Sequence, residues 1–451
     1  MMNKEKSMRT PICDFVRSYI SRNPLRMHMP GHKGVSLLGM EDADITEITG
    51  ADSLYEASGI IRESEENARE LFGSLATFYS TEGSSQCIRA MLYLALLAAR
   101  RDGREPLILA ARNVHKTFVT AVGLLDIEVE WIRSSPDTSY LACRVDTDAL
   151  EEQILATKPT AVYVTSPDYL GNTLDLAAIA AVCHRHGVLL LVDNAHGAYL
   201  KFLPQSQHPL DLGADLICDS AHKTLPALTG AAHLHLGQSA PAWMRDVAKD
   251  ALALFGSTSP SYLILQSLDA VNAYLADGYR QRLAAFAKEV ATLKAECLHR
   301  GYTLVGDEPM KLTLAPKSYG YTGQAFAAEL ERRGVICEFS DPDFTVLMLS
   351  CEQGRDGLSR LSEALWEIEP KESIMTKPPV YTPMQRVTSV REALFSARET
   401  IPTEKAEGRV LAALNVACPP AVPIAVCGER LDADAIARMQ YYGITRCDVM
   451  K

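Results

Sequence analysis

Short apolar runs alternate with longer segments of helical periodicity through the first half of the chain. The runs are apolar at nearly every position, and they occupy residues 106–111, 161–166, 188–193, 214–220 and 231–236. Continuous apolar strands are typical of a sheet that is covered on both faces. The segments between them, such as the strongly apolar stretch 84–103, favour helices. This repeated strand–helix–strand order predicts an α/β fold with a mostly parallel sheet.

The pattern changes on either side of this region. Residues 1–60 lack a clear period, and Pro30 with the glycines of "MHMPGHKG" excludes a helix interior. An amphipathic helix over 281–301 and strands over 311–316 and 344–350 indicate a second, smaller domain. The expected division is an N-terminal arm over 1–60, a large α/β domain over 61–270 and a small C-terminal α+β domain over 271–451, with a linker at about 369–383.

Composition narrows the class of protein. Of the 451 residues, 47% are hydrophobic and 22% are charged, and there is no run of about 18 apolar residues that would span a membrane. The first 20 residues lack the apolar core of a signal peptide, so we expect a cytoplasmic protein. A net charge of -11 argues against a nucleic-acid binder. The 11 cysteines are scattered without a C-x-x-C pair, as reduced core residues would be.

Polar side chains gather where three of the predicted strands end. They are Asn113 and His115 after the first run, Asp193 and His196 after the third, and Ser220, His222 and Lys223 after the fourth. Ligands of open α/β sheets bind at such carboxyl ends. A lysine at this position is usually a surface lysine, but together with an acid on another strand it suits pyridoxal phosphate. That cofactor needs a partly desolvated lysine amine, here Lys223, and an acid for its pyridine nitrogen, here Asp193.

A turn rich in small and hydroxyl residues leads into the helix near residue 84. In "STEGSSQCIRAML", over 80–92, Gly83, Ser84 and Ser85 precede the apolar helix. Backbone N–H groups and the dipole at a helix start favour a phosphate dianion. The alternative is an ordinary helix cap, and the pattern is not a Walker loop.

Eight motifs in order along the chain resemble those of the Orn/Lys/Arg decarboxylase family, in its short bacterial form. They lie at residues 28–34, 44–61, 111–117, 165–176, 192–199, 220–230, 257–269 and 408–429. The resemblance implies a fold-type-I pyridoxal-phosphate fold with a seven-stranded, mostly parallel sheet. It also implies decarboxylation of arginine, lysine or ornithine to the amine and CO2, as in polyamine metabolism. The chain begins close to "PGHKG", which leaves no room for the N-terminal wing domain of the family's larger enzymes.

The resemblance also implies a role for each site residue. Lys223 forms the Schiff base with pyridoxal 5'-phosphate, Asp193 pairs with its ring nitrogen, His115 stacks on its ring, and His196 lies near it. Its phosphate is held by Gly83, Ser84, Ser220 and His222, with Ser85 added from the residue pattern. The catalytic set is therefore Lys223, Asp193, His115 and His222, with Lys223 or His222 returning a proton to Cα. Ser257 and Thr258 are expected to reach a neighbouring subunit's phosphate, which implies a homodimer or a larger homo-oligomer with shared sites.

Several alternatives stay open at this point. The same cofactor residues serve aminotransferases and β-lyases, and Arg409 could clamp a substrate carboxylate as an aminotransferase requires. A binding protein without activity is a further alternative. Asp168 and Glu338 are candidate partners for a cationic substrate side chain, or else loop acids that face solvent. We expect no metal, because the histidines in "VCHRHG" and "HLH" suit a helix end and strand packing.

Overall fold

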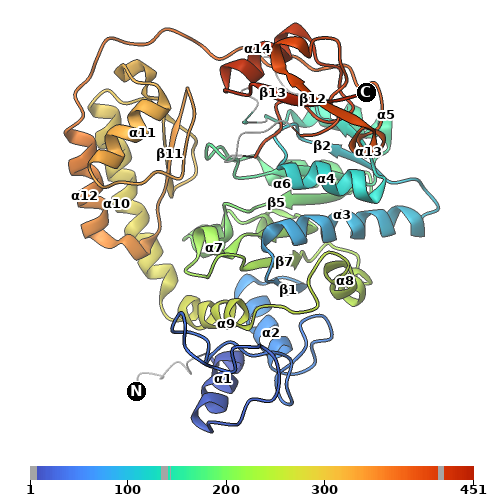
Figure 1. Cartoon of the computed structure of the whole chain (residues 1–451), viewed down its shortest axis with the longest axis vertical. Helices are drawn as coiled ribbons and strands as arrows, with labels where there is room; N and C mark the ends of the chain where they lie inside the picture. Colours follow the sequence, from blue (N-terminus) through green and yellow to red (C-terminus); the bar gives the residue numbers. More distant parts are fainter. Residues whose placement is uncertain (1–7, 134–140, 143, 415–420) are drawn as a thin grey trace. The chain divides into compact units, whose positions relative to one another are not determined.

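The computed structural model describes residues 8–133, 141–142, 144–414 and 421–451 (Figure 1). The chain divides into two compact units, and each is described by itself. Unit 1 comprises Met1–Ala98 and Leu189–Leu283, and unit 2 comprises Ala99–Val188 and Ala284–Lys451. None of the described helices is both long enough and apolar enough to cross a membrane.

Unit 1 carries the strand run β1-β7-β6-β5 of a seven-stranded sheet. Its strands are β1 (Ala76–Ser80), β5 (Leu189–Asp193), β6 (Leu216–Asp219) and β7 (Ala232–Leu236). Strands β5 and β6 are parallel, whereas β7 is antiparallel to both β6 and β1. Every residue of β6 and β7 is buried, as continuous apolar runs predict. The parallel strands β5 and β6 therefore end at the same edge.

The helices of unit 1 include one in the predicted arm. They are α1 (Pro11–Ser21), α2 (Ile60–Phe72), α3 (Gly83–Arg101), α7 (Ala221–Thr224), α8 (Met244–Ala253), α9 (Tyr262–Ala276) and the start of α10 (Tyr279–His299). The buried Asp269 of α9 accepts hydrogen bonds from the N–H groups of Ile12 and Cys13, at 3.0 Å each, and from the Ser64 hydroxyl at 2.6 Å. This carboxylate fastens the first turn of α1 to α2 and α9.

Unit 2 contains the strand run β4-β2-β3 and two smaller sheets. Strand β2 (Leu107–Ala110) is parallel to β3 (Glu128–Trp131) and to β4 (Ala161–Thr165). The second sheet has four antiparallel strands in the order β10 (Phe339–Ser340), β11 (Thr345–Met348), β9 (Lys311–Leu314) and β8 (Leu304–Val305). The third pairs β12 (Arg398–Pro402) with β13 (Arg446–Met450). The helices are α4 (Lys116–Leu125), α5 (Thr147–Thr157), α6 (Leu176–Arg185), α11 (Gly323–Arg332), α12 (Gly354–Trp366), α13 (Val390–Phe395) and α14 (Ala433–Tyr441).

An arginine at the end of β2 joins the C-terminal segment to the rest of unit 2. The Arg112 guanidinium donates to the carbonyls of Pro423 and Ile424 at 2.8 and 3.3 Å, and it pairs with Glu429 at 3.3 Å. Both charged side chains are buried, so each needs the other. Residues 423–429 are thereby held beside the end of the strand that leads to His115.

The mostly parallel sheet predicted from the apolar runs is confirmed, and all five runs are strands. Strands β1, β3, β8, β10, β12 and β13 were not predicted. They have two to five residues each, and in β3 only Val129 is buried, between Glu128 and Glu130. The three-part domain division stays a prediction.

Candidate active site

Lys223 lies on the single turn of α7, four residues past the end of β6. Its ammonium donates to Nε2 of His196 at 3.1 Å, and His196 is buried on the loop that follows β5. The lysine is partly buried. The segments that follow β5 and β6 thus bring the Lys223 amine and the His196 imidazole together.

Asp193 ends β5 and is 2% exposed. Its Oδ1 accepts the Ala195 N–H at 3.1 Å and the Cys218 thiol at 3.4 Å. Burial, followed by the charge of Asp193, raises the pKa of Cys218 well above its ordinary value, so the thiol stays protonated and donates. A buried carboxylate in these surroundings suits the protonated ring nitrogen of a cofactor, because that nitrogen would supply a positive charge for the carboxylate to face.

Four residues that were predicted to bind phosphate lie close together in unit 1. Gly83 opens α3 with φ +72°, a left-handed conformation that favours glycine. The Ser220 hydroxyl donates to the Ser84 hydroxyl at 2.8 Å. The His222 ring lies 4.0 Å from where a Cβ on Gly83 would stand, and its Nδ1 donates to the Ala231 carbonyl at 2.8 Å.

This arrangement fits a phosphate group. The first N–H groups of an α-helix lack partners within the helix; that of Gly83 donates to the Gly230 carbonyl at 2.8 Å, and two serine hydroxyls stand beside the turn. Because Nδ1 of His222 is turned toward a carbonyl, Nε2 is the nitrogen that would face an anion, and it donates when the ring is protonated. Ser85, also partly buried, is the third residue of the same helix.

The segment that holds Ser257 and Thr258 joins α8 to α9, and both residues are exposed. The Ser257 N–H donates to the Glu82 carboxylate, next to Gly83 in the same chain. The segment therefore begins beside the turn of its own chain that is predicted to bind phosphate. Its contact with a neighbouring subunit's phosphate stays a prediction.

His115 belongs to unit 2, where it caps α4. Its Nδ1 accepts the Thr117 N–H at 3.2 Å and the Thr117 hydroxyl at 2.9 Å. Two donors on Nδ1 place the ring proton on Nε2 and fix the plane of the imidazole. Such a fixed ring suits the stacking role, which stays a prediction. The adjacent Asn113 is buried, and its amide donates to the Leu141 carbonyl at 3.5 Å.

The two acids proposed for substrate recognition differ in their contacts within unit 2. Asp168 is buried; its Oδ1 accepts the N–H groups of Leu170 and Asn172, and its Oδ2 accepts the Asn172 amide. These bonds close the turn after β4, which favours a structural role for Asp168. Glu338 is exposed, accepts the Tyr169 hydroxyl at 3.0 Å, and lines a cavity of about 400 Å³ beside α12.

Arg409 has structural contacts too. Its guanidinium donates to the Glu399 carboxylate at 2.8 Å and to the Met450 carbonyl at 2.6 Å. These two partners lie on β12 and β13, so the arginine ties the C-terminal sheet together. A guanidinium used in this way does not favour the clamp that an aminotransferase would need for a substrate carboxylate.

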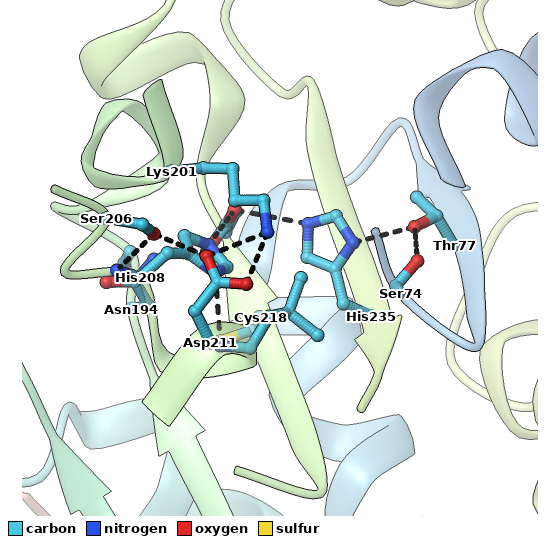
Figure 2. Close-up of polar contacts among 12 residues, drawn as sticks. Ser74, Thr77, Asn194, Lys201, Ser206, His208, Asp211, Cys218 and His235 are labelled. Carbon is cyan, nitrogen blue, oxygen red and sulfur yellow. Dashed lines mark hydrogen bonds and ion pairs between the residues drawn. The ribbon is translucent and has the colours of Figure 1, made fainter. Parts of the chain in front are cut away.

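The histidine motifs also have protein partners. His186, at the end of α6, contacts Glu151 at 2.7 Å. His235 of "HLH" contacts Asp219, a residue that the sequence reasoning missed (Figure 2). The sequence does single out Asp219, because it is the one charged residue of an otherwise apolar strand and directly precedes Ser220.

Comparisons with known proteins support the family that the sequence motifs resemble. The sequence profile of the Orn/Lys/Arg decarboxylase major domain matches residues 10–304, and that of its C-terminal domain matches residues 371–447. The chain is 30% identical to the uncharacterized protein YaaO of Bacillus subtilis, over 96% of this chain and 94% of that protein. It is 29% identical to an arginine decarboxylase of the same organism, over 95% and 92%. Its fold resembles the Francisella novicida lysine decarboxylase LdcF with a TM-score of 0.77, at 14% identity, over 98% of this chain and 81% of that one.

Asp193→Asn tests the acid at the end of β5. Without its charge, a ring nitrogen beside it would lose its proton, so we expect the turnover rate to fall about 100-fold or more while cofactor affinity falls less. The matched control is Asp215→Asn, a buried acid at the start of β6 that accepts the Leu190 N–H at 2.7 Å. Loss of cofactor with an unchanged rate per bound cofactor would contradict this role.

Asp168→Asn tests the structural role of that acid through the pH dependence of the free energy of unfolding. Burial raises the pKa of Asp168 from 3.8 to about 6, so the folded protein binds this proton more tightly than the unfolded chain. The stability it contributes is complete below the unfolded value and is lost as pH rises through the folded one. The variant should therefore gain about 1–3 kcal/mol relative to wild type between about pH 4 and pH 7. Calorimetry across this range checks it, and a pH-independent difference would refute it.

Proposed function

The chain belongs to the Orn/Lys/Arg decarboxylase family, and we propose that the basic amino acid from which it removes CO2 is arginine. The protein is a pyridoxal-phosphate-dependent decarboxylase of a basic amino acid. The observation that carries the choice of arginine is the match to an arginine decarboxylase over nearly the full length of both chains. Because identity is 29%, direct product analysis decides the matter.

The cofactor-binding role of unit 1 is proposed from its donor set. Lys223 would bind the cofactor aldehyde, Asp193 would pair with the ring nitrogen, and Ser84, Ser220 and His222 would hold the phosphate. When bound, pyridoxal phosphate supplies an electron sink for the electrons released as CO2 leaves. The residues of the chain fix its orientation and exclude water.

Proton return to Cα is proposed for Lys223. Its amine is hydrogen-bonded to His196 Nε2, which can take up a proton when the lysine becomes neutral and return it afterwards. His222 is the alternative donor. Its Nδ1 is turned toward the Ala231 carbonyl, which favours a fixed role on the phosphate side.

The substrate's cationic end is proposed to meet Glu338 in preference to Asp168. An arginine side chain needs an acid whose oxygens are available, because a buried unpaired guanidinium is costly. Asp168 already accepts three hydrogen bonds within its own turn, whereas Glu338 is exposed beside a cavity. The rival aminotransferase reading is not favoured, because Arg409 is used by the C-terminal sheet.

Assembly into a homodimer or larger homo-oligomer with shared sites is proposed from the arm. Residues 25–40 expose an unusual set of large apolar side chains: Leu25, Met27, Met29, Val35, Leu37, Leu38 and Met40. The turn that carries Leu37 and Leu38 is held by hydrogen bonds, because the Glu41 carboxylate accepts the N–H groups of residues 37–40. Apolar side chains held outward in this way fit a surface covered by a second copy.

A cytoplasmic location is proposed on the state of Cys218. This buried thiol donates its proton to Asp193 beside the predicted cofactor site. The contact needs the reduced form of the cysteine, which a reducing compartment maintains.

Product analysis with Lys223→Ala tests the activity. Wild-type protein incubated separately with arginine, lysine and ornithine should release CO2 fastest from arginine and yield the corresponding amine. Lys223→Ala should fold but lose turnover, because it has no amine to bind the cofactor or return the proton. Faster release from lysine or ornithine would refute the choice of arginine, and normal activity in the variant would refute the role of Lys223.

A double variant of the arm tests assembly. Leu37→Ser with Leu38→Ser removes two side chains that are 81% and 80% exposed in the single chain, so folding should be little affected. We expect the oligomer to dissociate at a protein concentration about tenfold higher than wild type, with activity lost as monomers form. Light scattering and assays over a dilution series measure both. The control is Leu298→Ser, an exposed leucine on α10. A wild-type monomer with full activity would contradict the proposal.

A further inference from the structure

A buried carboxylate with three donors lies beneath the predicted site in unit 1. Asp219 accepts the Asn194 amide at 2.7 Å on Oδ1, and it accepts His208 Nε2 at 3.0 Å and His235 Nε2 at 3.1 Å on Oδ2 (Figure 2). Asp219, Asn194, His208 and His235 are all 0% exposed. We call these four residues the Asp219 cluster.

The hydrogen bonds of the two imidazoles determine where their protons are. His208 Nδ1 accepts the Leu210 N–H at 3.2 Å, so its proton is on Nε2 and points to Asp219. His235 Nδ1 lies 2.8 Å from the Thr77 hydroxyl, which in turn contacts the Ser74 hydroxyl at 2.7 Å. Burial lowers the pKa of His235, which keeps the ring neutral with its Nε2–H on the carboxylate.

The carboxylate itself is ionised. Burial opposes its charge, but His208 and His235 together lower the pKa of Asp219 well below its ordinary value. The ligand atoms of Asp219, His208 and His235 lie within 4.8 Å of one another, a spacing that a metal ion could use. The Leu210 N–H on His208 argues for direct hydrogen bonds, because a metal on Nε2 would need the lone pair that the proton occupies.

Burying such a cluster in a protein core costs desolvation free energy. A buried charge contributes little net stability, and apolar residues of similar volume often serve as well or better. What a fully satisfied polar cluster does provide is a fixed relative position of the elements that carry its members. The elements here are β5, β6, β7 and, through Thr77, β1.

The position of the cluster along the chain indicates which parts of the predicted site it connects. Asn194 directly follows Asp193, and Asp219 directly precedes Ser220, four residues before Lys223. The bond from Asn194 to Asp219 therefore joins the two strand ends that carry the proposed acid, phosphate ligand and lysine. We propose that Asn194 and Asp219, supported by His208 and His235, are positioning residues that set the spacing between Asp193 and the segment Ser220–Lys223 for the cofactor. This inference rests on the cofactor roles proposed above.

Two variants test the proposal at different strengths. Asn194→Ala removes the side-chain bond between the strand ends, keeps the backbone bond from the Asn194 N–H to the Cys218 carbonyl, and leaves both histidines on Asp219. Asp219→Asn removes the charge but keeps the size of the side chain. The control is Asp215→Asn, at the opposite end of β6, which alters another buried acid that also bonds to the β5 side, through the Leu190 N–H.

The measurements separate positioning from stability. Apo-protein prepared from each holoenzyme is titrated with pyridoxal 5'-phosphate, the pH midpoint of the bound cofactor's absorption is recorded, and kcat and KM are measured separately. Asn194→Ala and Asp219→Asn should weaken cofactor binding about tenfold or more and lower kcat by a similar factor, with KM changed less, because small misplacements near reacting groups are costly. The pH midpoint should move, whereas Asp215→Asn should change only the melting temperature.

The outcomes are distinct from failure of the proposed function. Wild-type protein that binds no cofactor would refute the cofactor roles themselves. If wild type binds and turns over, but both variants match Asp215→Asn in affinity, pH midpoint and kcat, the cluster only stabilises the core and the inference is wrong. Should Asp219→Asn fail to fold, Asn194→Ala decides alone, because it leaves the charge of Asp219 and both histidine hydrogen bonds intact.

Discussion

A buried carboxylate at the end of a parallel strand must find donors on its neighbours, and unit 1 is organised around this requirement. Asp193 ends β5 and Asp219 ends β6, and both are buried. Asp219 accepts hydrogen bonds from three other segments, and Asp193 accepts the Ala195 N–H and the Cys218 thiol. We propose that Asp219 holds the strand ends in place and that Asp193 serves the cofactor.

The sequence predicted the residues whose position follows from strand ends. Lys223, Asp193 and Ser84 each stand where an apolar run ends or a helix begins, and parallel strands carry such ends to one edge. The Asp219 cluster could not be predicted in the same way. Its histidines lie 11 and 16 residues from Asp219, on a short 3₁₀ segment and on β7, and only the tertiary fold brings their rings to one carboxylate.

Acids in loops were the least predictable from sequence, because their partners are backbone N–H groups. Asp168, Asp52 and Glu41 each accept several N–H groups of their own turns. Asp52, for example, caps the start of α2 through Gly59 and Ile61. The chain carries a net charge of -11, yet these three acids organise loops. In such a chain, an acid is a candidate for recognition only after its backbone partners have been counted.

The same reasoning applies to the arm and explains why its leucines are informative. Leu37 and Leu38 are exposed on a turn whose N–H groups are held by Glu41, and Arg26 donates to the carbonyls of Glu41 and Asp42. Hydrogen bonds on both sides of the turn fix the direction of the two side chains. An apolar pair that merely lacked a partner would gain by folding back onto α1 or α2, since each buried leucine contributes about 1.5–3 kcal/mol. Because the Glu41 carboxylate and the Arg26 guanidinium hold this turn with the two leucines exposed, the turn is better suited to contact with another chain.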